Sequence, residues 1–135
     1  MANQYLHPDV FDDGLKVISD NSAMKIVVCA GVPASRQEAV DAVGTGSGKR
    51  VSSIIDLDAA DAVLGAHTGG RKVAIASKSG TAAVTTAGTE DLLIVIYDGT
   101  RILAINDETS DQQLTEDNPI TLPTFDIALA VVQPE

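Results

Sequence analysis

The sequence predicts a mainly β fold, either an antiparallel sandwich or a small barrel of about seven strands with a short N-terminal helix. Apolar runs rich in Val and Ile recur along most of the chain, and clusters of Gly, Pro, Asn and Asp separate them. Asp98-Gly99 stands between the apolar runs Leu92–Tyr97 and Arg101–Asn106, which is a strong signal for a tight hairpin. A chain of 135 residues corresponds to a single domain, 1–135.

The N-terminal part is expected to differ from the rest. Residues 1–7 are predicted to be a polar arm, residues 8–19 a helix, and residues 23–135 the β-rich body. Pro8 suits the first position of a helix, and Asp9 lies where the helix dipole favours a negative charge.

Within the β-rich body, alternation and β-branched composition indicate the strands. Ser35 and Glu38 have the spacing of a capping box, so a short helix is expected to run from there to about Val43. The segment Ala59–Ala66 is compatible with helix or strand, and a turn is expected at Ser79-Gly80. The expected strands are Met24–Ala30, Arg50–Asp56, Lys72–Lys78, Thr81–Thr86, Leu92–Tyr97, Arg101–Asn106, Ile120–Leu122 and Phe125–Val132.

The composition argues against several classes of partner. The net charge is −10, from 9 basic and 19 acidic residues, so binding to nucleic acid or to an anionic membrane surface is not expected. Aromatic residues make up only 3%, which is too few for an aromatic-lined ligand pocket. The N-terminus lacks the pattern of a signal peptide, and the longest apolar run, Leu92–Tyr97, is too short to span a bilayer.

Motifs that could carry chemistry are incomplete. The stretch Gly44–Arg50 resembles a phosphate-binding loop, but Val43 stands where the first Gly is required and Arg50 where a hydroxyl is required. Ser22-Ala23-Met24-Lys25 matches S-x-x-K but is expected between a helix and a strand, and we interpret the match as chance. The single cysteine, Cys29, lies in an apolar run and is expected to be a buried small hydrophobe.

No catalytic, cofactor-binding or metal-binding residue is therefore assigned. His7 and His67 are isolated and cannot complete a zinc site without carboxylates. The acidic loop 107–118 is expected to be a solvated surface, and paired carboxylates for glycoside hydrolysis stay a weak alternative because no aromatic platform accompanies them.

The whole chain resembles a family of small virion proteins of tailed bacteriophages, the head decoration or cement proteins. The resemblance is carried by four sets of segments, namely Tyr5–Leu15; Ile26–Ala30 followed by Val32-Pro33 and Glu38-Ala39; Gly70–Val73 with Ser79-Gly80 and Ala87–Thr89; and Leu114–Ile127.

The resemblance implies a structural protein that bridges capsomers on the outer capsid surface, with the major capsid protein and copies of itself, as a homotrimer, for partners. It implies no enzymatic activity, no cofactor, no nucleic acid or membrane partner, and a location in the virion after synthesis in the bacterial cytoplasm. Within this expectation, residues 1–7 order on binding, and Tyr5 and Leu6 are contact residues to the capsid or a neighbouring subunit. The alternatives are a tail or neck component, or a β module that binds host glycans.

Overall fold

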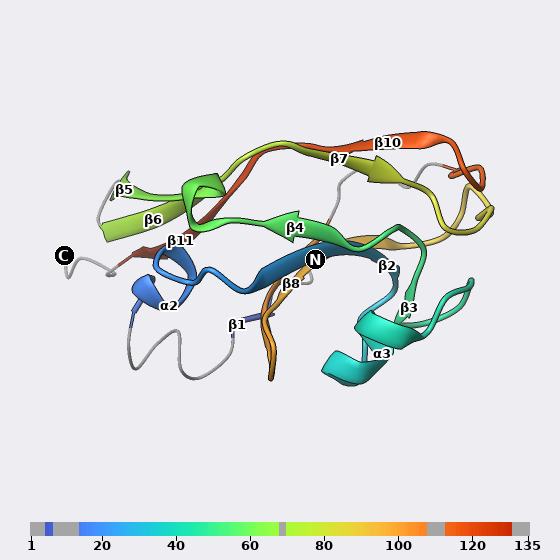
Figure 1. The fold of residues 1–135 in the computed structure, drawn as a ribbon, viewed down its shortest axis with the longest axis horizontal. Helices are drawn as coiled ribbons and strands as arrows, with labels where there is room; N and C mark the ends of the chain where they lie inside the picture. Colours follow the sequence, from blue (N-terminus) through green and yellow to red (C-terminus); the bar gives the residue numbers. More distant parts are fainter. Residues whose placement is uncertain (1–4, 7–13, 68–69, 108–112, 131–135) are drawn as a thin grey trace, which may run out of the picture.

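The computed structural model describes residues 5–6, 14–67, 70–107 and 113–130 (Figure 1). These residues form eleven strands, the helices α2 (Lys16–Ser19) and α3 (Arg36–Asp41), and a 3-10 turn, η1 (Ala59–Asp61). Every pairing between named strands is antiparallel, and the sheets are not closed into a barrel, so the predicted antiparallel sandwich is confirmed. The strands are β1 (Tyr5–Leu6), β2 (Met24–Ala30), β3 (Lys49–Arg50), β4 (Ile55–Leu57), β5 (Ala62–His67), β6 (Gly70–Ile75), β7 (Lys78–Thr81), β8 (Leu92–Tyr97), β9 (Ile102–Asp107), β10 (Pro119–Leu122) and β11 (Phe125–Ala130).

The main layer is a sheet in the order β1-β9-β8-β2-β3, with β4 also paired to β2. Two smaller sheets, β10-β7 and β11-β6-β5, complete the fold. In Figure 1, β7 and β10 run above β4 and β2, while β5, β6 and β11 lie toward one end of the molecule near α2. The small sheets thus cover one face of the main sheet, as in a sandwich.

The larger core cluster fills the space between these layers. Side chains at alternate positions of β2 and β8 point into it, because successive side chains of a strand point to opposite faces. Apolar residues of the small sheets and of α2 pack against them. The cluster includes Met24, Ile26 and Val28 of β2, Leu92, Ile94 and Ile96 of β8, and Ile18, Val73, Ile75, Leu122 and Ile127 from the other elements.

The opposite face of the main sheet is also buried. Val27 and Cys29 of β2 and Leu93, Val95 and Tyr97 of β8 form a second cluster there. Ala39 and Val40 of α3 pack onto this cluster. Strand β8 is therefore buried along its whole length, in agreement with its uninterrupted apolar sequence.

Between β3 and β4, the hydroxyl of Ser52 replaces a missing strand-to-strand hydrogen bond. The chain leaves β2 after Arg50 and returns to it at Ile55, which breaks the strand predicted over Arg50–Asp56 into two short ones. Within this gap, the backbone N–H of Val28 donates to Oγ of Ser52, and this hydroxyl donates to the carbonyl of Ser53. Ser52 is completely buried, and its side chain satisfies a backbone donor that would otherwise be left without a partner.

Other differences from the sequence predictions have local causes. Of the helix predicted over residues 8–19, residues 8–13 lie outside the described residues. In the described part the helix runs only from Lys16 to Ser19, because a turn precedes it at Gly14, whose φ is +71°. The segment predicted as helix or strand, Ala59–Ala66, is a 3-10 turn followed by β5.

The predicted turn at Ser79-Gly80 is wrong. Both residues lie inside β7, opposite Thr121 and Ile120 of β10. A Cβ atom at Gly80 would lie only 2.6 Å from Cδ1 of Ile55 and 2.8 Å from Oγ of Ser53. Glycine is therefore present for close packing between β7 and the main sheet and not for a turn.

An ion pair connects η1 to β7. Nζ of Lys78 lies 3.0 Å from Oδ2 of Asp61, and the backbone N–H of Asp58 donates to the same carboxylate. The hydrogen bond from Lys78, and to a smaller extent that from Asp58, lowers the pKa of Asp61 below its usual value. The carboxylate is therefore more stable in its charged form in the folded state than in the unfolded chain.

We predict that Lys78→Met destabilises the protein by up to about 1 kcal/mol near neutral pH. Because the pKa of Asp61 is lower in the folded state, its contribution is complete above the unfolded value near 3.8 and is lost as the pH falls through the folded value. Urea unfolding at pH 6 and at pH 3 measures this, with Lys16→Met on the exposed side of α2 as the control. A loss of stability that is equal at both pH values would contradict the assignment.

Cys29 is inaccessible and poorly ionised. It is completely buried in the second core cluster, and burial raises the pKa of its thiol to about 12, although Arg50 opposes the shift. Since the thiolate is the reactive form, this cysteine is chemically inert in the folded protein.

We expect the folded protein to resist alkylation by iodoacetamide at pH 8, with Cys29 reacting only when urea unfolds the chain. The reaction, followed by mass spectrometry, then reports global unfolding. A Thr45→Cys variant carrying Cys29→Ala is the control, since residue 45 is exposed, and it should react in native buffer. Rapid labelling of Cys29 in native buffer would refute the expectation.

Candidate functional site: an arginine-lined groove

The β8–β9 hairpin turn is organised around one carboxylate. Oδ1 of Asp98 accepts hydrogen bonds from the backbone N–H groups of Thr100 and Arg101, at 2.9 and 3.0 Å, and from Oγ1 of Thr100. Oδ2 accepts from Nδ2 of Asn21 and from Nε of Arg101, at 3.2 and 3.4 Å. The Asp98 side chain is only 10% exposed, so these donors replace most of its contact with water.

The same turn holds a second arginine. Nε of Arg36, at the start of α3, donates to the backbone carbonyl of Asp98 at 2.7 Å. Its guanidinium lies over the ring of Tyr97, 5.3 Å from the ring centroid, at a cation–π distance. Ser35 caps α3 by accepting a hydrogen bond from the N–H of Glu38, as the capping-box spacing predicted, and this fixes where α3 begins.

An open hollow of about 430 Å³ lies between these two segments, and we call it the Arg36–Arg101 groove. One side is formed by residues 32–36 and the other by residues 100–102 with Ile105. Val32 is 49% exposed, whereas Ile105 is buried, so aliphatic side chains line the groove beside the two guanidinium groups. Its lining residues are Val32, Pro33, Ala34, Ser35, Arg36, Thr100, Arg101, Ile102 and Ile105.

The two arginines of the groove have different partners. Arg101 is paired with the carboxylate of Asp98, which offsets its positive charge. The contacts described for Arg36 are with a carbonyl oxygen and an aromatic ring, and neither carries a formal charge. Arg36 therefore gives the lining of the groove a positive charge within a chain whose net charge is −10.

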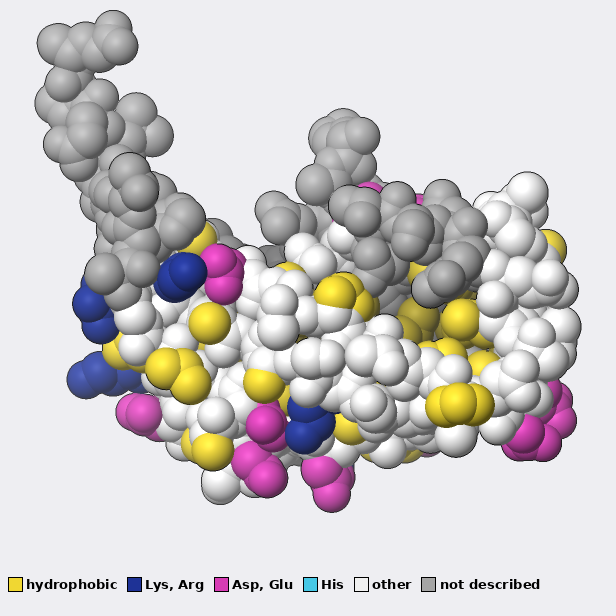
Figure 2. All heavy atoms as spheres, turned by 90° about the horizontal axis from the view of Figure 1, so that it is seen from above, with side chains coloured by type: hydrophobic (Ala, Val, Ile, Leu, Met, Phe, Trp, Pro, Cys, Tyr) yellow, Lys and Arg dark blue, Asp and Glu magenta, His cyan; other side chains and the backbone are white. Residues whose placement is uncertain are grey.

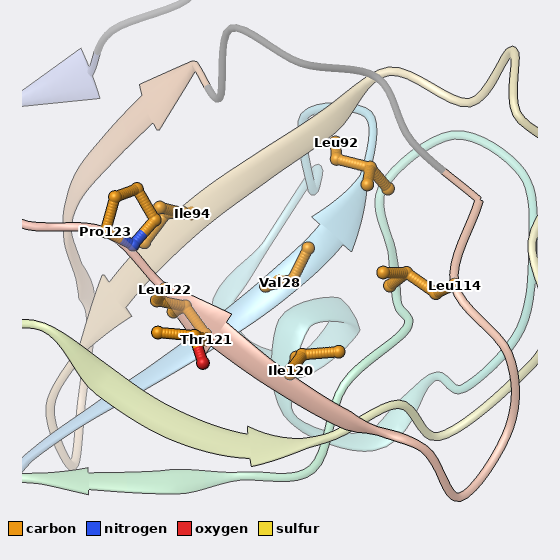
Figure 3. A pocket seen from close by; sticks show the side chains of 8 residues that line it. All are labelled: Val28, Leu92, Ile94, Leu114, Ile120, Thr121, Leu122 and Pro123. Atoms are coloured by element: carbon orange, nitrogen blue, oxygen red, sulfur yellow. The ribbon is translucent and has the colours of Figure 1, made fainter.

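A second hollow is apolar and much smaller. It holds about 30 Å³ between the main sheet and β10, and Figure 3 shows Val28, Leu92 and Ile94 on one side of it and Ile120 and Leu122 on the other. This is about the room for a single water molecule, and the aliphatic lining offers no set of hydrogen-bond partners for one. We interpret it as a packing gap between the layers.

The structure places the backbone of Tyr5 and Leu6, the predicted contact residues, in strand β1. They pair with Ile105 and Ala104 of β9 in the same chain. Their role as capsid or subunit contacts stays a prediction. His7 lies outside the described residues, and His67 is the last residue of β5.

The incomplete motifs do not form sites among the described residues. The loop 44–48 connects α3 to β3 and so does not lead from a strand into a helix, as a phosphate-binding loop does. Lys25, the lysine of the S-x-x-K match, forms an ion pair with Asp56 on the surface of β4. In the part of the chain that the structure describes, no cluster of His, Cys, Asp and Glu could hold a metal ion, and no helix is long and apolar enough to cross a bilayer.

Comparisons with protein-family models, with curated proteins and with solved structures find no match to this chain. The Arg36–Arg101 groove could not be predicted from the sequence. The capping box that contains Arg36 and the Asp98-Gly99 hairpin signal beside Arg101 are both local patterns, and no sequence signal connects these segments, which lie more than sixty residues apart.

We predict that Asp98→Ala destabilises the protein by about 1–3 kcal/mol, because it removes the acceptor of the N–H groups of Thr100 and Arg101 and of the Asn21 amide. Urea unfolding measures the change. Asp126→Ala is the matched control, since it removes only the exposed ion pair with Lys72 and should cost less than about 1 kcal/mol. Equal losses for the two variants would show that the Asp98 network is not important for stability.

Proposed function

We propose that this protein is a structural component of a bacteriophage virion that decorates the outer surface of the capsid and stabilises it by bridging capsomers. The proposal rests on the family resemblance of the sequence, together with an antiparallel β framework, which suits a protein that bears load between neighbours. Its partners are the major capsid protein and further copies of itself, arranged as a homotrimer.

The observation that carries the proposal is that buried side chains of chemically reactive types have structural roles in the fold. The thiol of Cys29 is buried and poorly ionised. The buried hydroxyls of Ser52 and Thr86 accept backbone N–H groups, from Val28 and Leu114. Asp98 holds the hairpin turn. These are the residue types from which nucleophiles and bases are made. Here the two hydroxyls and the carboxylate hold the backbone, and the thiol is enclosed in the second core cluster.

The surface charge supports an outer location. A net charge of −10 is repelled by DNA packed inside a capsid and favours a position on the outside. On the face seen in Figure 2, hydrophobic side chains lie mostly as separate spots among polar ones, with acidic groups along one edge. A surface of this kind suits a protein that binds at many repeated lattice positions, where individually weak contacts act together.

The test uses heads from phage that lack the gene for this protein. Purified protein added to these heads should co-sediment with them in a saturable manner, and the decorated heads should retain their DNA at temperatures that release it from undecorated heads. Bovine serum albumin, another acidic protein, added at the same concentration, is the control for non-specific association.

Failure of the protein to sediment with heads, or decorated heads that are as fragile as bare ones, would contradict the proposal. Electron microscopy with an antibody against the protein separates the alternatives, because label on tails or necks of intact virions would overturn an assignment to the capsid.

A further inference from the structure

We propose that the Arg36–Arg101 groove is a docking site for an extended acidic segment of a partner protein, with aliphatic residues between its carboxylates. The inference rests on the proposal that this protein works by binding other protein surfaces. It deepens that proposal by naming the surface used and the chemistry of the segment that binds there.

The first argument is that the guanidinium groups are already held in place. Nε of Arg36 is bound to the carbonyl of Asp98 and Nε of Arg101 to its carboxylate, so both side chains are anchored to one residue. The ring of Tyr97 supports the flat face of the Arg36 guanidinium. Since the side chains are ordered before a ligand arrives, less conformational entropy is lost when a carboxylate binds.

The second argument is charge. Arg101 is offset by Asp98, whereas the described contacts of Arg36 are with neutral groups. An arginine fork binds a carboxylate through paired N–H donors, which makes a carboxylate the complementary ligand for the groove. Because the chain as a whole carries a net charge of −10, an acidic segment has few other positive positions to bind.

The third argument is shape and lining. The groove is open, holds about 430 Å³, and lies in the size range of ligand sites, roughly 300–1,000 Å³. Val32, Ile102 and Ile105 give it aliphatic contacts beside the charged groups. An extended segment places successive side chains on opposite sides, so alternating acidic and aliphatic residues can meet both kinds of lining.

The groove also lies beside the second core cluster. Ile105 belongs to that cluster, and Ile102 is a partly buried neighbour of it. Helix α3, only six residues long, contributes Ala39 and Val40 to the cluster. A bound segment in the groove would extend the cover of this cluster beyond the start of α3.

The experiment titrates the ¹⁵N-labelled full chain with a six-residue peptide of alternating leucine and glutamate, acetylated and amidated at its ends. Signals of the backbone amides of residues 32–36 and 100–102 should shift in a saturable manner. The same peptide with glutamine in place of glutamate should bind at least about tenfold more weakly, because the charge-assisted hydrogen bonds are lost.

Variants then test the groove itself. Arg36→Gln should weaken peptide binding about tenfold, whereas Arg71→Gln, on the exposed surface of β6, should leave it unchanged. Ala34 is exposed on the wall of the groove and belongs to neither the core nor the Asp98 network, so its variants should fold normally. Ala34→Asp should weaken binding and Ala34→Lys should strengthen it.

Shifts confined to other surfaces, or equal binding of the glutamate and glutamine peptides, would overturn the proposal. So would inorganic phosphate that displaces the peptide at equal concentration, since the groove would then be a general anion site. If the peptide fails to bind while the protein still decorates heads, the groove proposal falls and the proposed capsid function stands.

Discussion

The central constraint in this fold is that strand β8 is apolar on both faces and must be covered on both. Its six residues are all buried, with alternate side chains in the two core clusters. Hydrogen bonding to β2 and β9 satisfies its backbone within the sheet. Cover on one face comes from the small sheets, and on the other α3 contributes two of the packing side chains. The layered architecture follows from this requirement, because burial of apolar area is the dominant favourable term in folding.

The Asp98 turn connects this central strand to the surface that we assign to binding. Asp98 directly follows β8, and its hydrogen bonds reach Arg101 just before β9, Arg36 at the start of α3 and Asn21 before β2. One residue thus positions the cover of the second core face and both arginines of the groove. A change that loosens the turn is expected to affect stability and recognition together, since the same hydrogen bonds support both.

The side-chain chemistry of the described residues also suits the proposed role in binding other proteins. The buried hydroxyls of Ser52 and Thr86 and the carboxylate of Asp98 accept backbone hydrogen bonds, and the thiol of Cys29 is enclosed in the core. The groove offers the guanidinium of Arg36 beside aliphatic side chains, and arginine is enriched at protein interfaces. The physical case for a binding role therefore comes from what the side chains do within the fold.

Local patterns in the sequence determined those parts of the fold that depend on neighbouring residues. The Asp98-Gly99 hairpin, the buried run of β8, strand β2 and the cap at Ser35 were all predicted, because turn chemistry, period and capping act over a few residues. Gly80 was misassigned as part of a turn, since its small size is required by Ile55 and Ser53, which are distant in sequence. Tertiary structure alone decided how Arg36 and Arg101 meet at Asp98, because long-range packing of α3 against the hairpin brings them together, and no local pattern encodes that approach.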